Sequence, residues 1–197
     1  MKIKILTASN DLEDFRHLTK KYIDVLLPIE YLKRSKVVSF CHQGGAMCGG
    51  FVLVKNEPLR VLESIPANYF AQIPIDLSNV AEITGLWLDS KKADNIFCSI
   101  LFWLALYYNL SSSSFDGFVY AYALKKKNLR RIYATFCPVT LFEGLTKQLE
   151  GMASPEKEAV EFITKRKVRL APFQHFKFFS RRFTLILKTF KRYVVRA

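Results

Sequence analysis

The chain has 197 residues with a formal net charge of +13, and half of its residues are hydrophobic. This composition excludes a disordered protein, and the length suits one domain with a sizeable core, with or without an appendage. No apolar run approaches the roughly 18 residues of a membrane-spanning helix, and the N-terminus lacks the pattern of a signal peptide. We therefore expect a cytoplasmic protein.

The first half of the chain alternates between strand and helix signals. A short strand-like stretch is followed by apolar residues at helical spacing, which end at Pro28. Two further strands flank Gly44-Gly45, a pattern that is typical of an antiparallel hairpin. We therefore expect a strand at 2–8, a helix between 11 and 26, strands at 37–42 and 46–55, and a mostly helical segment at 58–70.

The second half adds two apolar strands, each followed by a helix, and a final strand. The stretch 115–124 is nearly continuous in apolar residues, as expected for a strand that is buried on both faces. The element order predicts an α/β fold with a mixed central sheet in one layer, flanked by helices on both sides. The expected elements are strands at 80–89, 115–124 and 139–149, helices at 93–109 and 126–136, and a linker or short helix within 151–164.

The net charge is concentrated in the C-terminal segment. Residues 165–197 carry eleven Lys and Arg and no acid, which leaves a charge of +2 for the rest of the chain. Apolar residues recur at helical spacing between Phe176 and Val194, so we expect a basic amphipathic helix. Such a helix either packs on the protein's own core or binds an anionic membrane surface, at the inner face, through residues 174–196. Nucleic acid is a less favoured partner, because the segment has no recognisable reader motif.

The sequence offers no complete metal site or hydrolase site. Its four cysteines are dispersed, and Cys41, His42 and Cys48 supply at most part of a metal site. No Ser-His-Asp or Cys-His arrangement has a supporting context. We therefore expect neither a metal nor a permanently bound cofactor.

Three stretches together resemble the GCN5-related N-acetyltransferase superfamily: AEITGLWLDS with its following turn and helix, FDGFVYAYAL, and KKKNLRRIY. There is a partial likeness to the autoinducer synthases and N-acyl amino acid synthases among its relatives. The resemblance implies an acyltransferase-like domain over residues 1–150, with a mixed, mostly antiparallel central sheet flanked by helices. This domain would be joined through 151–164 to the basic segment 165–197. The resemblance also implies an N-acyltransferase that moves an acyl group from acyl-CoA or acyl carrier protein, used as a co-substrate, to an amine.

The resemblance also implies where the donor binds. In this superfamily the central strand pairs through its backbone with the pantetheine arm, and the next turn receives the phosphates. The backbone of Leu86, Trp87 and Leu88 would hold the arm, together with Asn128, which would otherwise cap its own helix. The phosphates would bind to the turn residues Lys91, Lys92, Ala93, Asp94 and Asn95.

For the chemistry, the resemblance implies Glu82 as the general base and Tyr133 as the general acid. Alternation along the strand is expected to place Glu82 on the same face as Leu86 and Leu88. A plainer interpretation of Glu82 is a carboxylate at the end of a sheet, paired with a nearby cation. The plainer interpretation of Tyr133 is an amphipathic residue at the edge of the core.

The phosphate turn departs from the pattern of the superfamily. It has no glycine, the residue that lets a backbone approach phosphate closely and adopt a positive φ. Asp94 opposes a diphosphate, whereas Lys91 and Lys92 attract one. We therefore predict a retained scaffold with weakened binding of free coenzyme A, which favours longer or carrier-bound acyl groups. The alternative is a catalytically degenerate protein that acts as a binding or regulatory module.

Overall fold

The computed structural model describes residues 2–42, 44–55, 57–70, 73, 76, 78–89 and 96–174, and of residues 96–98, 127 and 128 it describes the backbone only. The strands are β1 (Lys2–Leu6), β2 (Lys36–Cys41), β3 (Met47–Val54), β4 (Val80–Leu88), β5 (Gly117–Ala123), β6 (Val139–Leu145) and β7 (Lys157–Thr164). The helices are α1 (Ser9–Ile23), α2 (Ile29–Lys33), α3 (Arg60–Glu63), α4 (Ala67–Phe70), α5 (Ile96–Ser111), α6 (Lys127–Ala134) and α7 (Lys165–Gln174).

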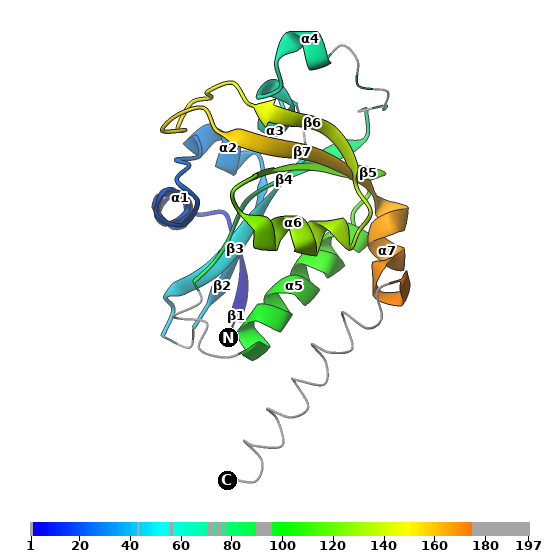
Figure 1. Cartoon of the computed structure of the whole chain (residues 1–197). Coiled ribbons are helices and arrows are strands. Elements are labelled where there is room, and N and C mark those ends of the chain that lie inside the picture. The colour runs from blue at the N-terminus through cyan, green and yellow to red at the C-terminus, as the bar shows by residue number, and fades with distance from the viewer. Residues whose placement is uncertain are drawn as a thin grey trace.

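The strands form one sheet in the order β1-β2-β3-β4-β5-β7-β6 (Figure 1). Neighbours are antiparallel except for β4 and β5, which are parallel. The predicted mixed, mostly antiparallel sheet is therefore confirmed, as is the hairpin of β2 and β3. The strand that carries AEITGLWL is internal, so it is buried between neighbours on both sides.

The segment predicted to be a linker or short helix is instead part of the sheet. β7 pairs antiparallel with both β5 and β6, and its residues 159–163 are buried. Glu158 and Glu161 interrupt its apolar run, and its stability comes from long-range pairing rather than from a local pattern. The sheet therefore extends the domain to Thr164, and α7 packs against it through Val168 and Ala171.

Helices cover both faces of the sheet (Figure 1). On one face α1, α2 and α3 pack around Phe15 and Leu32, and on the other α5, α6 and α7 pack around Phe51 and Phe102. These four side chains are almost completely buried. The centre of the sheet therefore has a packed core on each side, which holds β4 rigidly.

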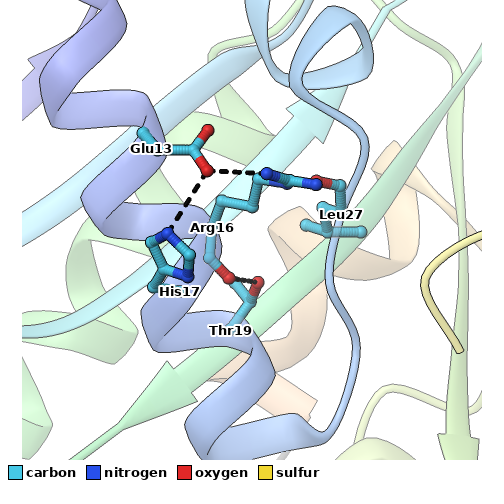
Figure 2. A network of polar contacts seen from close by, with 5 residues as sticks. All are labelled: Glu13, Arg16, His17, Thr19 and Leu27. Atoms are coloured by element: carbon cyan, nitrogen blue, oxygen red, sulfur yellow. Dashed lines mark hydrogen bonds and ion pairs between the residues drawn. The ribbon is translucent and has the colours of Figure 1, made fainter. Parts of the chain in front are cut away.

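A network of polar contacts holds the chain that leaves α1 (Figure 2). Arg16 donates from Nε to the carbonyl of Leu27 at 2.9 Å and from Nη1 to Glu13 Oε1 at 2.6 Å. The same Glu13 oxygen lies 3.3 Å from His17 Nε2, and Thr19 Oγ1 donates to the carbonyl of Arg16 at 2.8 Å. These contacts fix Leu27, which is buried and lines the central cavity.

The predicted amphipathic helix between Phe176 and Val194 lies outside the described residues, which end at Gln174. Within the described part, no helix is both long enough and apolar enough to cross a membrane. α7 already combines the cations of the basic segment with exposed apolar side chains, because Phe173 is 79% exposed and Leu170 is 37% exposed.

Candidate functional site

β4 and β5 are paired over only part of their length. Parallel pairing joins Val80–Ile83 to Gly117–Tyr120 and ends there. Beyond that point β4 stays paired with β3 on its other side, through Gly49 and Gly50. Along the described residues, the edge of β4 that faces β5 therefore has backbone N–H and C=O groups outside the ladder of the sheet. Such an edge can pair with an extended ligand, as an added strand would.

A cavity of about 340 Å³ opens where the two strands diverge. Its volume lies in the range of pockets that bind small molecules and cofactors. One wall of the cavity is apolar and is formed by α5 and α6. Charged side chains line other parts of the cavity, and most of them belong to α3 and to the connections before α6 and β7. The apolar wall consists of Trp103, Leu106, Leu110, Leu129, Ile132 and Phe136, and the charged lining residues include Asp24, Arg60, Lys125, Lys126, Glu156 and Glu158.

Glu82 is the third residue of β4; it lies at the wall of this cavity and is completely buried. Tyr31 Oη, from α2, donates to Glu82 Oε1 at 2.6 Å, and the N–H of Val61, from α3, donates to Oε2 at 3.0 Å. Burial raises the pKa of Glu82 to about 7, although both hydrogen bonds and the charge of Arg60 oppose the shift. A carboxyl group with this pKa can accept and release a proton at neutral pH.

The plainer interpretation of Glu82, a carboxylate paired with a cation at the end of a sheet, is wrong. Glu82 lies inside the sheet, paired with Val54 of β3 and Val119 of β5, and its hydrogen-bond donors are a hydroxyl and a backbone amide. The nearby cation, Arg60, lies over the ring of Tyr31 at 5.6 Å and donates from Nη2 to the carbonyl of Glu150. Because both donors are neutral, the carboxylate of Glu82 has no paired positive charge. Burial is therefore the largest influence on its pKa and raises it.

The alternation of β4 breaks at Gly85, which has a φ of +57° at a shift of register with β3. This β-bulge places one extra residue in the strand. Beyond it, Trp87 packs in the core on the side of α1, whereas Leu86 and Leu88 pack with the opposite core. The expectation that Leu86 and Leu88 share the face of Glu82 is therefore wrong, because a shift of one residue reverses the two faces.

Tyr133, the predicted general acid, lies on α6 and lines the same cavity. Its ring packs on Tyr120 at 4.7 Å and on Tyr122 at 5.3 Å, measured between ring centres. Burial, followed by the charge of Glu161, raises the pKa of Tyr133 above that of an ordinary tyrosine. The hydroxyl is therefore protonated at neutral pH. Tyr133 and Glu82 both line the cavity.

The predicted donor-binding residues lie in different surroundings. Leu86 lines the cavity, whereas the side chain of Trp87 is buried against α1, and Leu88 pairs with Gly49 of β3. Asn128 is part of α6, and its side chain lies outside the described residues. The turn formed by Lys91, Lys92, Ala93, Asp94 and Asn95 also lies outside them.

The cysteines considered as partial metal ligands lie in strands. Cys41 and Cys48 are buried in β2 and β3, and Cys48 Sγ donates to the carbonyl of Phe40 at 3.3 Å. In the described part of the chain, no group of three or more His, Cys, Asp or Glu side chains could hold a metal ion.

Sequence reasoning missed the partners of Glu82 and a second buried carboxylate. Tyr31 and Val61 lie 51 and 21 positions from Glu82, in short helices without a local signal. Glu161 is 7% exposed in β7. A single acid between apolar residues is a signal that could have revealed it.

No family model matches the sequence, and no curated protein matches it. Solved structures do match its fold. FeeM, an N-acyl amino acid synthase from uncultured soil microbes, matches with a TM-score of 0.62 at 17% identity, over 87% of this chain and 96% of that one. An N-acetyltransferase from Staphylococcus aureus Mu50 matches with a TM-score of 0.56 at 9% identity, over 84% of this chain and 97% of that one.

A third match is the spermidine N-acetyltransferase of Vibrio cholerae, solved in complex with CoA and spermine. Its TM-score is 0.54 at 12% identity, and the match covers 85% of this chain and 97% of that one. At such identities the likeness concerns the fold.

Proposed function

This chain has the fold of the GCN5-related N-acetyltransferase superfamily, and from that premise we propose that it transfers an acyl group from a thioester to an amine. The observation that carries the proposal is the cavity between the diverging halves of β4 and β5, with the buried carboxyl group of Glu82 at its wall. A thioester held between these strands would have its carbonyl carbon near a group that can take a proton from the amine.

Each residue has a defined part in the reaction. The amine nitrogen attacks the carbonyl carbon, and as the C–N bond forms, Glu82 takes the proton of the amine directly or through water. The C–S bond then breaks, and Tyr133, which is protonated at neutral pH, donates its proton to the leaving thiolate. The products are an amide and a free thiol, and both side chains return to their starting states by exchange with solvent.

The donor is acyl-CoA or acyl carrier protein, which present the same pantetheine arm. We assign the arm to the backbone edge of β4 at Leu86–Leu88 and to Asn128, and the phosphates to the turn Lys91–Asn95. The apolar wall of α5 and α6 supports an acyl group longer than acetyl, because a long chain removes more apolar surface from water there. The glycine-free turn of the sequence supports weak holding of the diphosphate.

The test is a thioester screen. The protein is incubated with CoA thioesters of several chain lengths and with acylated carrier protein, each with a pool of amines, and thiol release is followed. We expect release that depends on the amine and falls by about 10²–10⁴ in Glu82→Gln, the range for general acid–base catalysis. Glu57→Gln, which removes an exposed carboxylate, is the control. Equal release by wild type and Glu82→Gln would contradict the role of Glu82.

A binding or regulatory module is the second candidate function. It is favoured by the geometry of Glu82, whose two oxygens already accept hydrogen bonds from α2 and α3. In this role Glu82 would join the helices to the sheet and take no part in chemistry. Calorimetry with coenzyme A, acyl-CoA and acyl carrier protein separates the candidates, since an enzyme must bind at least one donor and a module need not.

We also propose that the basic segment brings the domain to an anionic membrane, at the inner face. Support comes from the eleven cations without an acid in residues 165–197 and from the exposed Phe173 of α7. Flotation with vesicles tests this, comparing neutral with anionic lipid at rising salt. Binding should require anionic lipid and weaken with salt. A form with Phe179→Ser and Phe183→Ser should bind less, and recovery that is independent of lipid charge would contradict the proposal.

A further inference from the structure

A second buried carboxylate lies on the face of the sheet opposite to Glu82. Glu161 in β7 is 7% exposed and stands directly across from Tyr120 of β5 in the antiparallel register. Tyr120 belongs to the core beneath α5, α6 and α7, whereas Val119, the neighbour of Glu82 in the register, belongs to the core of α1 to α3. The cavity between β4 and β5 therefore has one buried acid on each side of the sheet.

The surroundings of Glu161 are formed by tyrosines. Tyr122 Oη donates to Glu161 Oε1 at 2.9 Å. The hydroxyl of Tyr120 and Glu161 Oε2 have no hydrogen-bond partner among the described residues, although the charge of Glu161 helps to raise the pKa of Tyr120. No Lys, Arg or His in the described part forms an ion pair with Glu161. A buried carboxylate without a cation is stabilised by nearby hydrogen-bond donors, and here the donor is the hydroxyl of Tyr122.

The same tyrosines form the wall of the cavity. Tyr120, Tyr122 and Tyr133 all line it, whereas Glu161 does not. The ring of Tyr133 is tilted against both strand tyrosines, at 48° to Tyr120 and 47° to Tyr122. Any effect of Glu161 on a bound ligand must therefore pass through these three rings, which we call the tyrosine wall.

We propose that Glu161 is a positioning residue, which orients the hydroxyl of Tyr122 and thereby fixes the ring of Tyr133 that packs on it in the cavity. The inference rests on the proposed function in one respect, namely that Tyr133 acts on the leaving thiolate. Tyr122, held to the carboxylate by its hydrogen bond, and the neighbouring ring of Tyr120 together form the surface on which Tyr133 packs. A ring packed on that surface has little freedom to turn its hydroxyl away from the reacting atoms.

The charges around the wall support this arrangement. Burial is the larger cause of the raised pKa of all three tyrosines, and Glu161 raises each pKa further. Two other charges face Tyr122: Arg130 of α6, which lowers its pKa, and Glu143 of β6, which raises it. Arg130 Nη2 and Glu143 Oε2 form an ion pair at 3.6 Å, so their charges act on Tyr122 in opposite directions, and Glu161 affects the pKa of Tyr122 more than either.

Two variants separate the charge from the hydrogen bond. Glu161→Gln keeps an acceptor for Tyr122 and removes the charge, whereas Tyr122→Phe removes the donor and keeps the ring. Glu57→Gln removes an exposed carboxylate and serves as the control. The primary measurement is NMR of tyrosine labelled with carbon-13 at the ring carbon that bears the hydroxyl, which reports the hydrogen bonding of each hydroxyl at neutral pH. Tyr→Phe variants assign the three signals.

We expect the signals of Tyr120, Tyr122 and Tyr133 to move in Glu161→Gln, while the control leaves them in place. In thioester turnover, Glu161→Gln should lower kcat about tenfold and leave KM within about twofold of wild type. The expected loss in kcat is smaller than the rate enhancement of a general acid, because the variant keeps Tyr133 itself. Unmoved tyrosine signals would overturn the inference, and so would moved signals with unchanged kcat. If wild type releases no thiol from any thioester, the proposed function fails, whereas the NMR result still decides whether Glu161 orders the tyrosine wall.

Discussion

Glu82 and Glu161 are both carboxylates buried in the centre of one sheet, yet their surroundings differ. Glu82 is completely buried, and its two oxygens accept hydrogen bonds from two short helices. Glu161 accepts one hydrogen bond from a neighbouring strand and keeps one oxygen without a partner among the described residues. The first borders the cavity, and the second lies behind a wall of aromatic rings.

The difference shows how one sheet can give two acids separate tasks. Burial without a paired charge brings the pKa of Glu82 to about 7, where it can exchange a proton with a ligand in the cavity. Glu161 touches the cavity only through tyrosines, so it can orient a donor but cannot itself take a proton from an amine there. The comparison therefore predicts that only one of the two carboxylates controls the pH dependence of turnover.

The largest expected effect concerns turnover as a function of pH. In wild type, kcat/KM should rise with pH through an acid limb with an apparent pKa of about 7, because Glu82 must be ionised to act as a base. Glu82→Gln should lose this limb along with about 10²–10⁴ of the rate, whereas Glu161→Gln should keep it. A pH–rate profile of the three proteins measures this. Loss of the limb in Glu161→Gln would reverse the assignment of the two acids.

The next effect concerns folding. Because the pKa of Glu82 is about 7 in the folded state and 4.5 for an ordinary glutamate, the folded chain holds a proton that the unfolded chain has lost between these pH values. The contribution of Glu82 to stability is therefore greatest below pH 4.5 and declines as the pH rises to 7, by on the order of 3 kcal/mol.

Urea unfolding of wild type and Glu82→Gln at a series of pH values measures this linkage. The variant should gain stability relative to wild type as the pH rises through this window, and the gain should stop above it. A difference that is constant with pH would show that burial does not raise the pKa of Glu82.

The smallest effect comes from removing one hydroxyl beside each carboxylate. Tyr31→Phe and Tyr122→Phe should each cost about 1–3 kcal/mol of stability, since each leaves a buried acceptor with one donor fewer. Only Tyr31→Phe should also raise the pKa of Glu82, because its hydrogen bond lowers that pKa. The acid limb of turnover should therefore move to higher pH in Tyr31→Phe and stay in place in Tyr122→Phe. Equal shifts in both would show that the two sites are not independent.

The bulge at Gly85 shows how far local patterns reach along β4. Alternation placed the strand correctly, and the resemblance carried by that strand pointed to Glu82. The same alternation gave the wrong face for Leu86 and Leu88, because a glycine with positive φ inserts a residue that the period does not contain. The strand β7 was missed for a related reason, since its pairing with β5 and β6 is invisible to a local pattern.

The sequence by itself determined features that depend on neighbouring residues. These are the apolar runs that become β4 and β5, the mixed class of the sheet, the acid at position 82 and the concentration of cations after residue 164. The tertiary structure decided the partners. Tyr31 and Glu82 are 51 positions apart, and Tyr122 and Glu161 are 39 positions apart. Bringing such pairs into contact depends on strand order and on the short pairing of β4 with β5, which follow from how whole faces pack together and have no signature in any single stretch of chain.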